Sequence, residues 1–342
     1  MGRKLRLLVG IGLGAVALVW FLWDVDWAEL SDTLTRVHLG WVALSAAIIL
    51  GESVVRALRW QILLRPLGTR AALGDLFAAT VIGAAINTLF PLRAGEVAKA
   101  LVVRRRTGHP IAAVVATWVM ERVYDLLGMV SVLVLMVLVL PPGASAEGEL
   151  VTNLKLYGGL AGFGALSAML VFFYLATRPQ AARDVFARIV SIAPPPVANR
   201  FLDLFDGFVR GLGNSRDRSG VVQVGALTIF LWVALAGAIY CLFLAFDMHL
   251  PFGAACFTSV AVALSVVLPQ APGFVGVFHV AMAKTMVLWG QPAASAQGFA
   301  IIFWACSFLP VTLVGLVYAW REGLHVADLE RGLERAGELE TR

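Results

Sequence analysis

The stretch NTLFPLRAGEVAKA, Asn87 to Ala100, decides how the rest of this 342-residue chain is organised. It places three ionisable side chains inside an otherwise apolar sequence, namely Arg93, Glu96 and Lys99. Ionisable groups at membrane depth cost free energy, so such a cluster predicts a functional site. Pro91 and Gly95 interrupt regular helix, and a broken helix within a bilayer survives only against protein or a wet cavity. We therefore expect a helix that enters the membrane, turns and comes back.

Composition places the chain among membrane proteins. Hydrophobic residues make up 60% of it and charged residues 14%, with a mean hydropathy of +0.84, whereas charged residues form about a quarter of a soluble domain. The net charge of +5 does not indicate nucleic-acid binding, because the arginines gather in short segments between apolar runs. The sequence predicts an all-α polytopic integral membrane protein.

Enzyme and metal motifs are missing from the sequence. Its three cysteines, Cys241, Cys256 and Cys306, lie in apolar segments without metal-ligand spacing, which predicts small buried side chains. Zinc-type ligand sets, a P-loop and a nucleophile elbow are absent. We therefore expect no cofactor, no metal and no catalytic residue. An intramembrane enzyme that acts on a lipid-linked substrate is the alternative.

The N-terminal part predicts two full spans. Leu7 to Trp23 is long enough to cross a hydrocarbon core of about 30 Å, and basic residues precede it while acidic residues follow. The positive-inside rule then makes the N-terminus cytoplasmic. Bulky side chains at the end of this span, including Trp20 and Phe21, favour an uncleaved span over a signal peptide. Leu39 to Leu64 returns to the cytoplasmic side.

Residues 73–103 predict a re-entrant hairpin. The segment begins soon after Arg70 and ends in a run of three arginines, so both of its ends carry cytoplasmic charge. Its second arm, Pro91 to Val103, would be about 20 Å long as a helix, too short for a core of about 30 Å. We expect the turn near Asn87 to Pro91.

The middle of the chain predicts further spans and a cytoplasmic linker. Ile111 to Leu140 crosses outward and Leu156 to Thr177 returns. Residues 178–220 carry seven arginines and include an amphipathic helix at 201–212. This helix lies in the membrane interface, packs on the ends of its neighbours, or does both. Val221 to Phe246 then crosses outward again.

A second hairpin is predicted near the C-terminus. Phe252 to Leu268 and Phe274 to Trp289 flank the sequence PQAPG at 269–273, and neither outer end carries Lys or Arg. These two arms would enter the membrane from the face opposite to the first hairpin. Ser295 to Trp320 crosses inward for the last time.

These segments form one predicted transmembrane domain. We predict about six full spans and two re-entrant hairpins of opposite orientation, with both termini cytoplasmic, and about eight to ten spans as the alternative. The domain covers residues 1–322, with halves at 1–177 and 221–322 joined by 178–220, and a charged cytoplasmic tail at 323–342. Hairpins in two halves are typical of the inverted repeats of secondary transporters.

The two predicted turns point to an anion site. A half-helix that starts near Pro91 would direct its partly positive N-terminus at the middle of the bilayer, next to Arg93. Pro272 and Gly273 would start a second half-helix, which carries His279. Two such ends that meet near the midplane would hold a phosphate.

The ionisable residues near the two turns differ in whether the sequence favours a functional or a structural role. Arg93 and Glu96 favour function, because a buried ion pair contributes little stability by itself. Lys99, in contrast, is expected to reach outward and anchor the segment at the cytoplasmic interface. His279 is the histidine that lies far inside an apolar run, where a core position is more frequent than a ligand or base.

Two further helical faces carry charge. Glu121 and Asp125 lie one turn apart on one face, with Arg122 between them in sequence. A similar face on the second span carries Glu52, Arg56 and Arg59. The two carboxylates could relay protons, bind a cation or hold arginines of another helix. Pairing, for example of Arg56 or Arg93 with either carboxylate, is at least as consistent with the sequence as substrate contact.

Four motifs follow one another along the chain. They are R-x-L-R-W at Arg56–Trp60, N-x-x-x-P-x-R-x-G-E at Asn87–Glu96, E-R-x-x-D at Glu121–Asp125 and P-x-x-P-G-x-x-G at Pro269–Gly276. This ordered set resembles the lysylphosphatidylglycerol synthase transmembrane, or flippase, domain family over nearly the whole chain. The residues that we assign to substrate binding are Asn87, Pro91, Arg93, Gly95, Glu96, Glu121, Arg122, Asp125, Arg56, Arg59, Pro269, Pro272, Gly273, Gly276 and His279.

The resemblance implies an inner-membrane protein related to the domain that moves aminoacylated phosphatidylglycerol between leaflets. The aminoacyl-transferase domain of the full-length synthases is expected to be absent, which argues against lysyl transfer. The variant APGFVGVFH at 271–279 is similar to a subgroup associated with hopanoid and other isoprenoid or glycolipid gene clusters. We therefore expect a flippase-like transporter of an anionic phospho-, glyco- or isoprenoid lipid.

The rival hypothesis belongs to another class of protein. A membrane scaffold or accessory subunit of a lipid or glycan biosynthesis complex would use the helix at 201–212 as its docking surface. The expected partners are membrane lipids, with an enzyme of lipid biosynthesis and a second copy of the chain as further alternatives, and no nucleic acid.

Overall fold

A computed structural model describes residues 18–19, 21–23, 25–65, 71–90, 94–107, 111–139, 180, 183–184, 187–188, 218–267 and 272–322. Regular structure in these residues is helical throughout, which confirms the prediction of an all-α chain. The elements are α2 (Trp27–Thr35), α3 (Leu39–Leu64), α4 (Leu73–Leu89), α5 (Ala94–Thr107), α6 (Ile111–Val139), α10 (Arg218–Ala245), α11 (Phe252–Val267), the 3₁₀ turn η2 (Pro272–Phe274), α12 (Val277–Leu288) and α13 (Ala293–Arg321).

Several expectations concern other parts of the chain. The start of the predicted first span, the outer loop and span at 140–177, the amphipathic helix at 201–212 and the tail at 323–342 lie outside the described residues. Within the described part, three helices are long and apolar enough to cross a membrane, namely Leu39–Leu64, Ser219–Ala245 and Ala293–Arg321.

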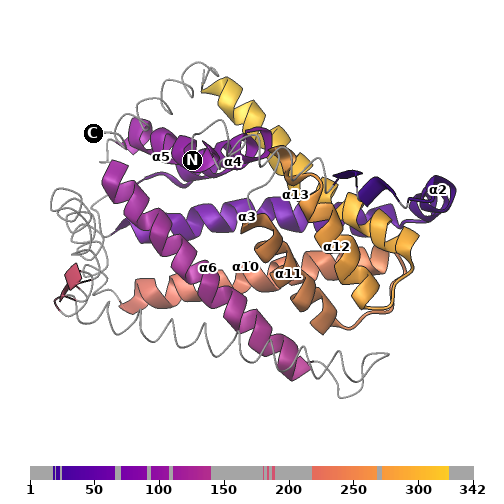
Figure 1. Ribbon diagram of the computed structural model, residues 1–342. Coiled ribbons are helices and arrows are strands. Elements are labelled where there is room, and N and C mark those ends of the chain that lie inside the picture. Colours follow the sequence, from indigo (N-terminus) through magenta and orange to yellow (C-terminus); the bar gives the residue numbers. More distant parts are fainter. Residues whose placement is uncertain are drawn as a thin grey trace.

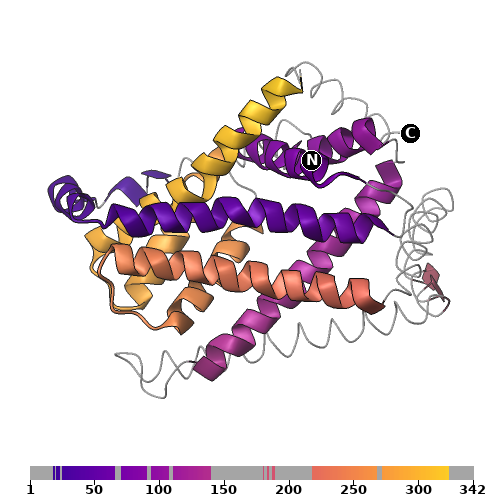
Figure 2. The same ribbon diagram turned by 180° about the vertical axis from the view of Figure 1, so that it is seen from behind.

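Helices α3 and α10 form the centre of the molecule and run antiparallel. The His38 N–H, just before α3, donates to the Ala245 carbonyl at the end of α10 over 3.0 Å. At the other end, Arg65 Nη1 donates to Gln223 Oε1 over 3.4 Å. Both views show the two helices side by side along their length, with α6 crossing them diagonally (Figures 1 and 2). Helices α4, α6, α11 and α13 pack against this pair.

Helices α4 and α5 form the first hairpin. Gly83 and Gly95 bring the two arms into backbone contact, because a Cβ on Gly95 would overlap the carbonyl oxygen of Gly83. At the open end, Arg106 at the end of α5 forms ion pairs with Asp75 in the first turn of α4 and with Glu322 after α13. Both ends of this hairpin therefore lie at the C-terminal end of α13.

Helices α11 and α12 form the second hairpin, whose open end lies at the opposite end of the molecule. Phe252 at the start of α11 contacts Tyr240 near the end of α10, with ring centroids 5.8 Å apart. Phe257 contacts Trp289, just after α12, with centroids 6.2 Å apart. The end of α10 marks the same end of the molecule as the start of α3, so the two hairpins enter from opposite ends.

Helix α13 lies along both hairpins and shows where their turns meet. Near its middle, Trp304 Nε1 donates to the Gly273 carbonyl in the second turn over 2.7 Å. Nearer its C-terminal end, Gly315 packs so closely on α4 that a Cβ would overlap the Val81 carbonyl. A Cβ on Gly273 would lie 3.9 Å from the Thr88 carbonyl oxygen at the end of α4. The turns of the two hairpins thus contact each other beside the middle of α13.

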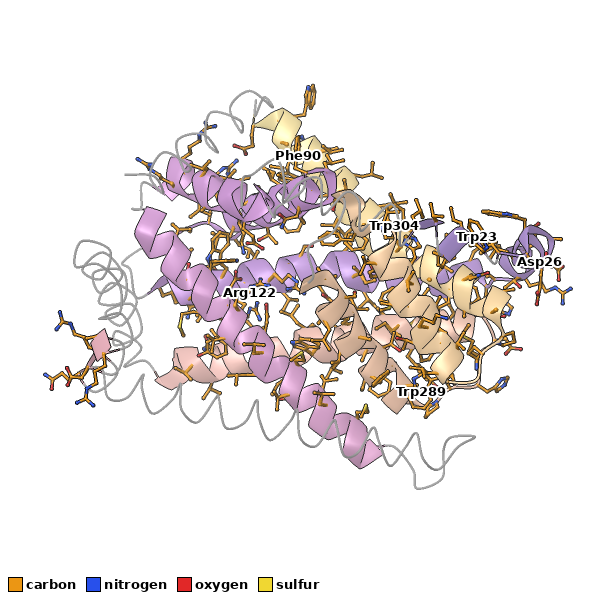
Figure 3. The ribbon with its side chains drawn as sticks, viewed as in Figure 1. Trp23, Asp26, Phe90, Arg122, Trp289 and Trp304 are labelled. Atoms are coloured by element: carbon orange, nitrogen blue, oxygen red, sulfur yellow. The ribbon has the colours of Figure 1, made fainter. Side chains whose placement is uncertain are left out.

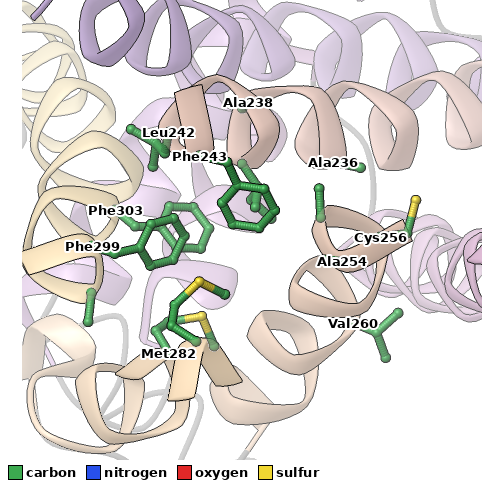
Figure 4. Packing of buried hydrophobic residues seen from close by; sticks show 14 of the residues in the cluster. Ala236, Ala238, Leu242, Phe243, Ala254, Cys256, Val260, Met282, Phe299 and Phe303 are labelled. Carbon is green, nitrogen blue, oxygen red and sulfur yellow. The ribbon is translucent and has the colours of Figure 1, made fainter. Parts of the chain in front are cut away.

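The main hydrophobic core joins the second hairpin to α10 and α13. Phe243 of α10 and Phe299 of α13 have ring centroids 5.6 Å apart, and Phe299 is equally distant from Phe303. Figure 4 shows these rings facing Met282 of α12, with Ala254 of α11 beside them. Burial of this much aromatic surface is strongly favourable, so it fixes the second hairpin on its neighbours.

Most predicted helix bounds agree with the structure, but α2 was missed. Leu39–Leu64 is confirmed, and the segments predicted for α6, α10 and α13 agree within a few residues. No helix was predicted between Trp23 and Leu39. In the structure, Asp26 Oδ1 caps α2 by accepting from the N–H groups of Ala28 and Glu29 at 3.0 and 3.1 Å, and Leu30 packs inward. This capping pattern was readable from the sequence.

The contact between α6 and α10 gives a first prediction. Gly128 of α6 lies against the Trp232 ring of α10, and a Cβ at this position would overlap that ring. Gly128→Ala should therefore lower stability by about 1–3 kcal/mol through overpacking. Gly225→Ala on α10 is the matched control, because no atom lies within 4 Å of its Cβ position. Thermal unfolding in detergent would measure both, and equal melting temperatures would contradict the close contact.

Candidate functional site

The first hairpin turn is held together by the Asn87 side chain. Its Oδ1 accepts a hydrogen bond from the Gly95 N–H in the first turn of α5, over 2.8 Å. Helix N-terminal amides need such partners, so this bond caps α5. The described part of α5 begins at Ala94. Asn87, predicted to bind substrate, thus has a structural partner in this arrangement.

The second turn differs from the half-helix that the sequence suggested at Pro272. Residues 272–274 form a 3₁₀ turn in which Gly273 has a φ of 74°. Gly276 has a φ of 90° and immediately precedes α12, which begins at Val277. Left-handed backbone of this kind favours glycine, because a Cβ would be strained. The prediction that α12 starts at Pro272 and Gly273 is therefore wrong, although both residues lie in the turn.

His279 lies in the first turn of α12 and is buried by aromatic rings. Its ring centroid is 5.2 Å from that of Phe21 and 5.7 Å from that of Trp304. Within the described residues, its buried Nδ1 has no hydrogen-bond partner. The surroundings agree with a core position beside the second turn.

A buried charge network lies where α3, α5, α6 and α10 come together. At its centre is Arg59, whose side chain is 0% exposed. Arg59 Nη1 donates to Asp125 Oδ1 over 2.6 Å and to Thr228 Oγ1 of α10 over 3.1 Å. Its Nη2 lies 3.8 Å from Glu121 Oε1. This one guanidinium therefore joins α3 to α6 and α10.

Lys99 belongs to this network, so its predicted role as a cytoplasmic anchor is wrong. Its Nζ lies 2.7 Å from Glu121 Oε2 and 4.0 Å from the centroid of the Trp60 ring. The Trp60 ring is held by a bond from its Nε1 to Thr117 Oγ1 over 2.9 Å. The carboxylate and the ring face attract the ammonium inward. Lys99 thereby ties the first hairpin to α3 and α6.

Two other arginines of the predicted site, Arg56 and Arg122, have partners on their own helices. Arg56 Nη2 lies 3.2 Å from Glu52 Oε2, one turn earlier on α3, so it does not form the pairing suggested with Glu121 or Asp125. Arg122 Nη2 lies 3.4 Å from Asp125 Oδ2 on α6. Figure 3 shows Arg122 on α6 near the middle of the view, far from Trp23 and Asp26 at the end that carries α2.

The structure describes most, but not all, of the residues that were predicted to form the site. Glu96 is half-buried, and its Oε2 has no hydrogen-bond partner among the described residues. Pro91, Arg93 and Pro269 lie outside those residues, so the predicted contacts of Arg93 stay predictions. The charge network and the meeting turns are two neighbouring groups, joined by the first hairpin, which carries Lys99 and Asn87.

Sequence reasoning missed several residues that position these groups. They are Trp60, Gly83, Thr117, Thr228 and Trp304. Trp60 is part of the motif R-x-L-R-W, but nothing in the sequence indicated that its ring would receive Lys99. The two threonines gave no signal either, because their partners come from other helices.

Comparison with known proteins gives the family context. Residues 7–315 match the family model described as lysylphosphatidylglycerol synthase TM region. A UPF0104 membrane protein of Methanothermobacter thermautotrophicus is 26% identical over 321 residues, which cover 89% of this chain and 91% of that protein. The glycosyltransferase AglD of Haloferax volcanii is 25% identical over 334 residues, 92% of this chain but 54% of that protein. The chain thus spans about half the length of AglD. With its apolar helices, the family match identifies a multi-pass membrane protein.

Proposed function

Because this chain belongs to the lysylphosphatidylglycerol synthase TM region family, we propose that it is a flippase-like transporter that moves an anionic lipid between membrane leaflets. One observation carries the proposal. Two helical hairpins enter from opposite ends of the molecule, and their turns meet at Thr88 and Gly273 beside the middle of α13. Such opposed, discontinuous helices are typical of transporters that bind their substrate near the bilayer midplane.

The arrangement in the membrane follows from helix length and charge. Helix α13 has 29 residues, about 43 Å as a helix, enough to cross the bilayer together with part of its headgroup regions. Arg65, Arg321 and the arginines that end α5 lie at one end of the molecule, which we place in the cytoplasm. The hairpins are then re-entrant, one from each side of the cell's inner membrane, alongside about six full spans.

The proposed path takes the headgroup through the protein while the acyl or isoprenoid tails stay in lipid. Arg93 and the amide groups that begin α5 and α12 would attract the anionic group at the turns. Glu96, whose Oε2 lacks a partner within the described residues, adds a carboxylate on the same side. Rocking of the two halves about the meeting turns would expose this site to one leaflet and then to the other. We propose transport without a covalent step.

Headgroup translocation by the purified chain tests this function. Proteoliposomes with a panel of fluorescent phospholipids and isoprenoid lipids should move at least one anionic lipid faster than empty liposomes do. Arg93→Ala should abolish that movement without a change in melting temperature. Arg36→Gln is the control, because Arg36 pairs with Asp32 on exposed α2 at the far end of the molecule. Wild-type rates equal to those of empty liposomes across the panel would refute the proposal.

A second candidate function rests on the match to a longer relative. In a relative named as a glycosyltransferase, the part that is similar to this chain makes up 54% of the length. This chain would then serve as the membrane partner of a glycan or lipid biosynthesis enzyme. Stable co-purification with such an enzyme, together with wild-type function of Arg93→Ala in cells, would favour this candidate over transport.

A further inference from the structure

Four buried hydrogen-bond donors at the crossing of α3 and α6 have no acceptor among the described residues. They are Arg59 Nε, Arg59 Nη2, Trp118 Nε1 and Arg122 Nε. The fully buried Arg59 contributes two of them. Buried donors in native proteins nearly always meet a protein group, a water or a ligand, because an unmet donor costs free energy. These donors therefore indicate a place for an acceptor.

Two of the residues that carry these donors, Arg59 and Arg122, bind the same carboxylate. Arg59 Nη1 lies 2.6 Å from Asp125 Oδ1, and Arg122 Nη2 lies 3.4 Å from Asp125 Oδ2. Trp118 and Arg122 are one helical turn apart on α6, and Asp125 follows after about one more turn, so these three side chains share a face. Trp118, with its free donor, therefore lies on the same face of α6 as the ion-paired Arg122 and Asp125.

The charges in this network do not balance. Ion pairs link Arg59, Lys99 and Arg122 to Glu121 and Asp125. Three cations against two carboxylates leave one positive charge. Glu52 and Arg56 lie close enough to Asp125 to interact electrostatically with it, but they pair with each other and add no net charge. An added group with one negative charge would complete the network, and a phosphodiester carries that charge on oxygens that accept several hydrogen bonds.

Exposure shows from which side such a group would arrive. The Arg122 side chain is 43% exposed, whereas that of Glu121 is 2% exposed. The neighbouring Leu126 is 57% exposed, so the outer face of α6 at this level is apolar. A half-exposed guanidinium within a membrane needs an anionic or aqueous partner. The network is therefore closed by protein around Arg59 and open beside Arg122.

We propose that Arg59, Trp118 and Arg122 form an oxyanion subsite that takes the phosphodiester of a lipid headgroup or free phosphate. The lipid version rests on the proposed transport function, because it places the headgroup beside α6 in the cytoplasmic half before it reaches the hairpin turns. The oxyanion bonds to the free donors and shares the guanidinium groups with Asp125. Glu121 contacts both Arg59 and Lys99. Binding of an oxyanion at Arg59 would therefore act on the first hairpin through the ion pair of Glu121 with Lys99.

Binding to the purified full chain in neutral detergent tests the subsite. The probes are short-chain phosphatidylglycerol, inorganic phosphate, and a diacylglycerol with the same chains. We expect phosphatidylglycerol to bind at least about tenfold more tightly than diacylglycerol. Arg122→Gln and Trp118→Phe should each weaken the affinity for phosphatidylglycerol about tenfold, as loss of a hydrogen bond to a charged group does. Arg36→Gln should leave the affinity unchanged.

The results distinguish a lipid headgroup from free phosphate as the bound group, and they test the subsite separately from the transport function. Tighter binding of phosphatidylglycerol than of phosphate assigns the subsite to lipid headgroups, and equal binding assigns it to soluble phosphate. Affinities that neither Arg122→Gln nor Trp118→Phe changes, with melting temperatures like the wild type, overturn the subsite. Translocation is measured on the same preparations. Variant-sensitive binding without translocation would refute transport alone, and translocation with variant-insensitive binding would refute the subsite alone.

Discussion

Arg59→Met should strongly destabilise the protein. Removing one partner of a buried ion pair typically costs about 3–5 kcal/mol, and without Arg59 the Asp125 carboxylate would keep only its 3.4 Å contact with Arg122. Here the change would strip Asp125 of its 2.6 Å contact and Thr228 of its donor, and it would leave Glu121 to Lys99 alone. A loss of this size is a large part of the stability of a typical protein, which is about 5–15 kcal/mol. Thermal unfolding in detergent micelles would measure it.

Two variants show whether the cost comes from burial of the charge. Arg36 and Asp32 of α2 also lie 2.6 Å apart, but their side chains are 76% and 59% exposed. Arg36→Gln should therefore cost only about 0–1 kcal/mol. Combining Arg59→Met with Asp125→Leu should recover much of the lost stability, since both buried charges of the pair are then gone. A wild-type melting temperature for Arg59→Met alone would show that Arg59 does not support the fold.

Gly95→Ala should abolish transport. The added methyl group would overlap the Gly83 carbonyl and the Asn87 side chain, so the arms of the first hairpin would have to separate. Overpacking of this kind costs about 1–3 kcal/mol. The displacement falls on the turn that contacts Gly273, so we expect headgroup translocation to fall to the level of empty liposomes. Folded protein should still be recoverable, because the main core lies between α10, α12 and α13.

The control for this variant lies on the same hairpin. Gly74 is in the first turn of α4, and no atom lies within 4 Å of its Cβ position. Gly74→Ala should retain transport, and it also favours helix by up to about 1 kcal/mol. If Gly95→Ala transported lipid at the wild-type rate, the close contact of the two arms would not matter for function.

Local pattern determined most helices of this protein. Long apolar runs bounded by charge fix where a helix begins and ends in a membrane, so the prediction of Leu39–Leu64 matches α3. The ion pair of Glu52 with Arg56 likewise follows from their spacing, because residues one turn apart are neighbours on any helix. The cap at Asp26 was equally local, and α2 could have been found from it.

Only the tertiary structure decided which charges meet. Lys99 lies near the cytoplasmic arginines in sequence, which suggested an outward anchor, but packing of α5 on α3 and α6 brings Trp60 and Glu121 to its ammonium. Arg59 and Asp125 are 66 residues apart, and their pairing depends on the crossing of α3 and α6. The turns at Asn87 and Gly273 meet for the same reason. Sequence pattern acts over a few residues, whereas a buried charge selects its partner in three dimensions.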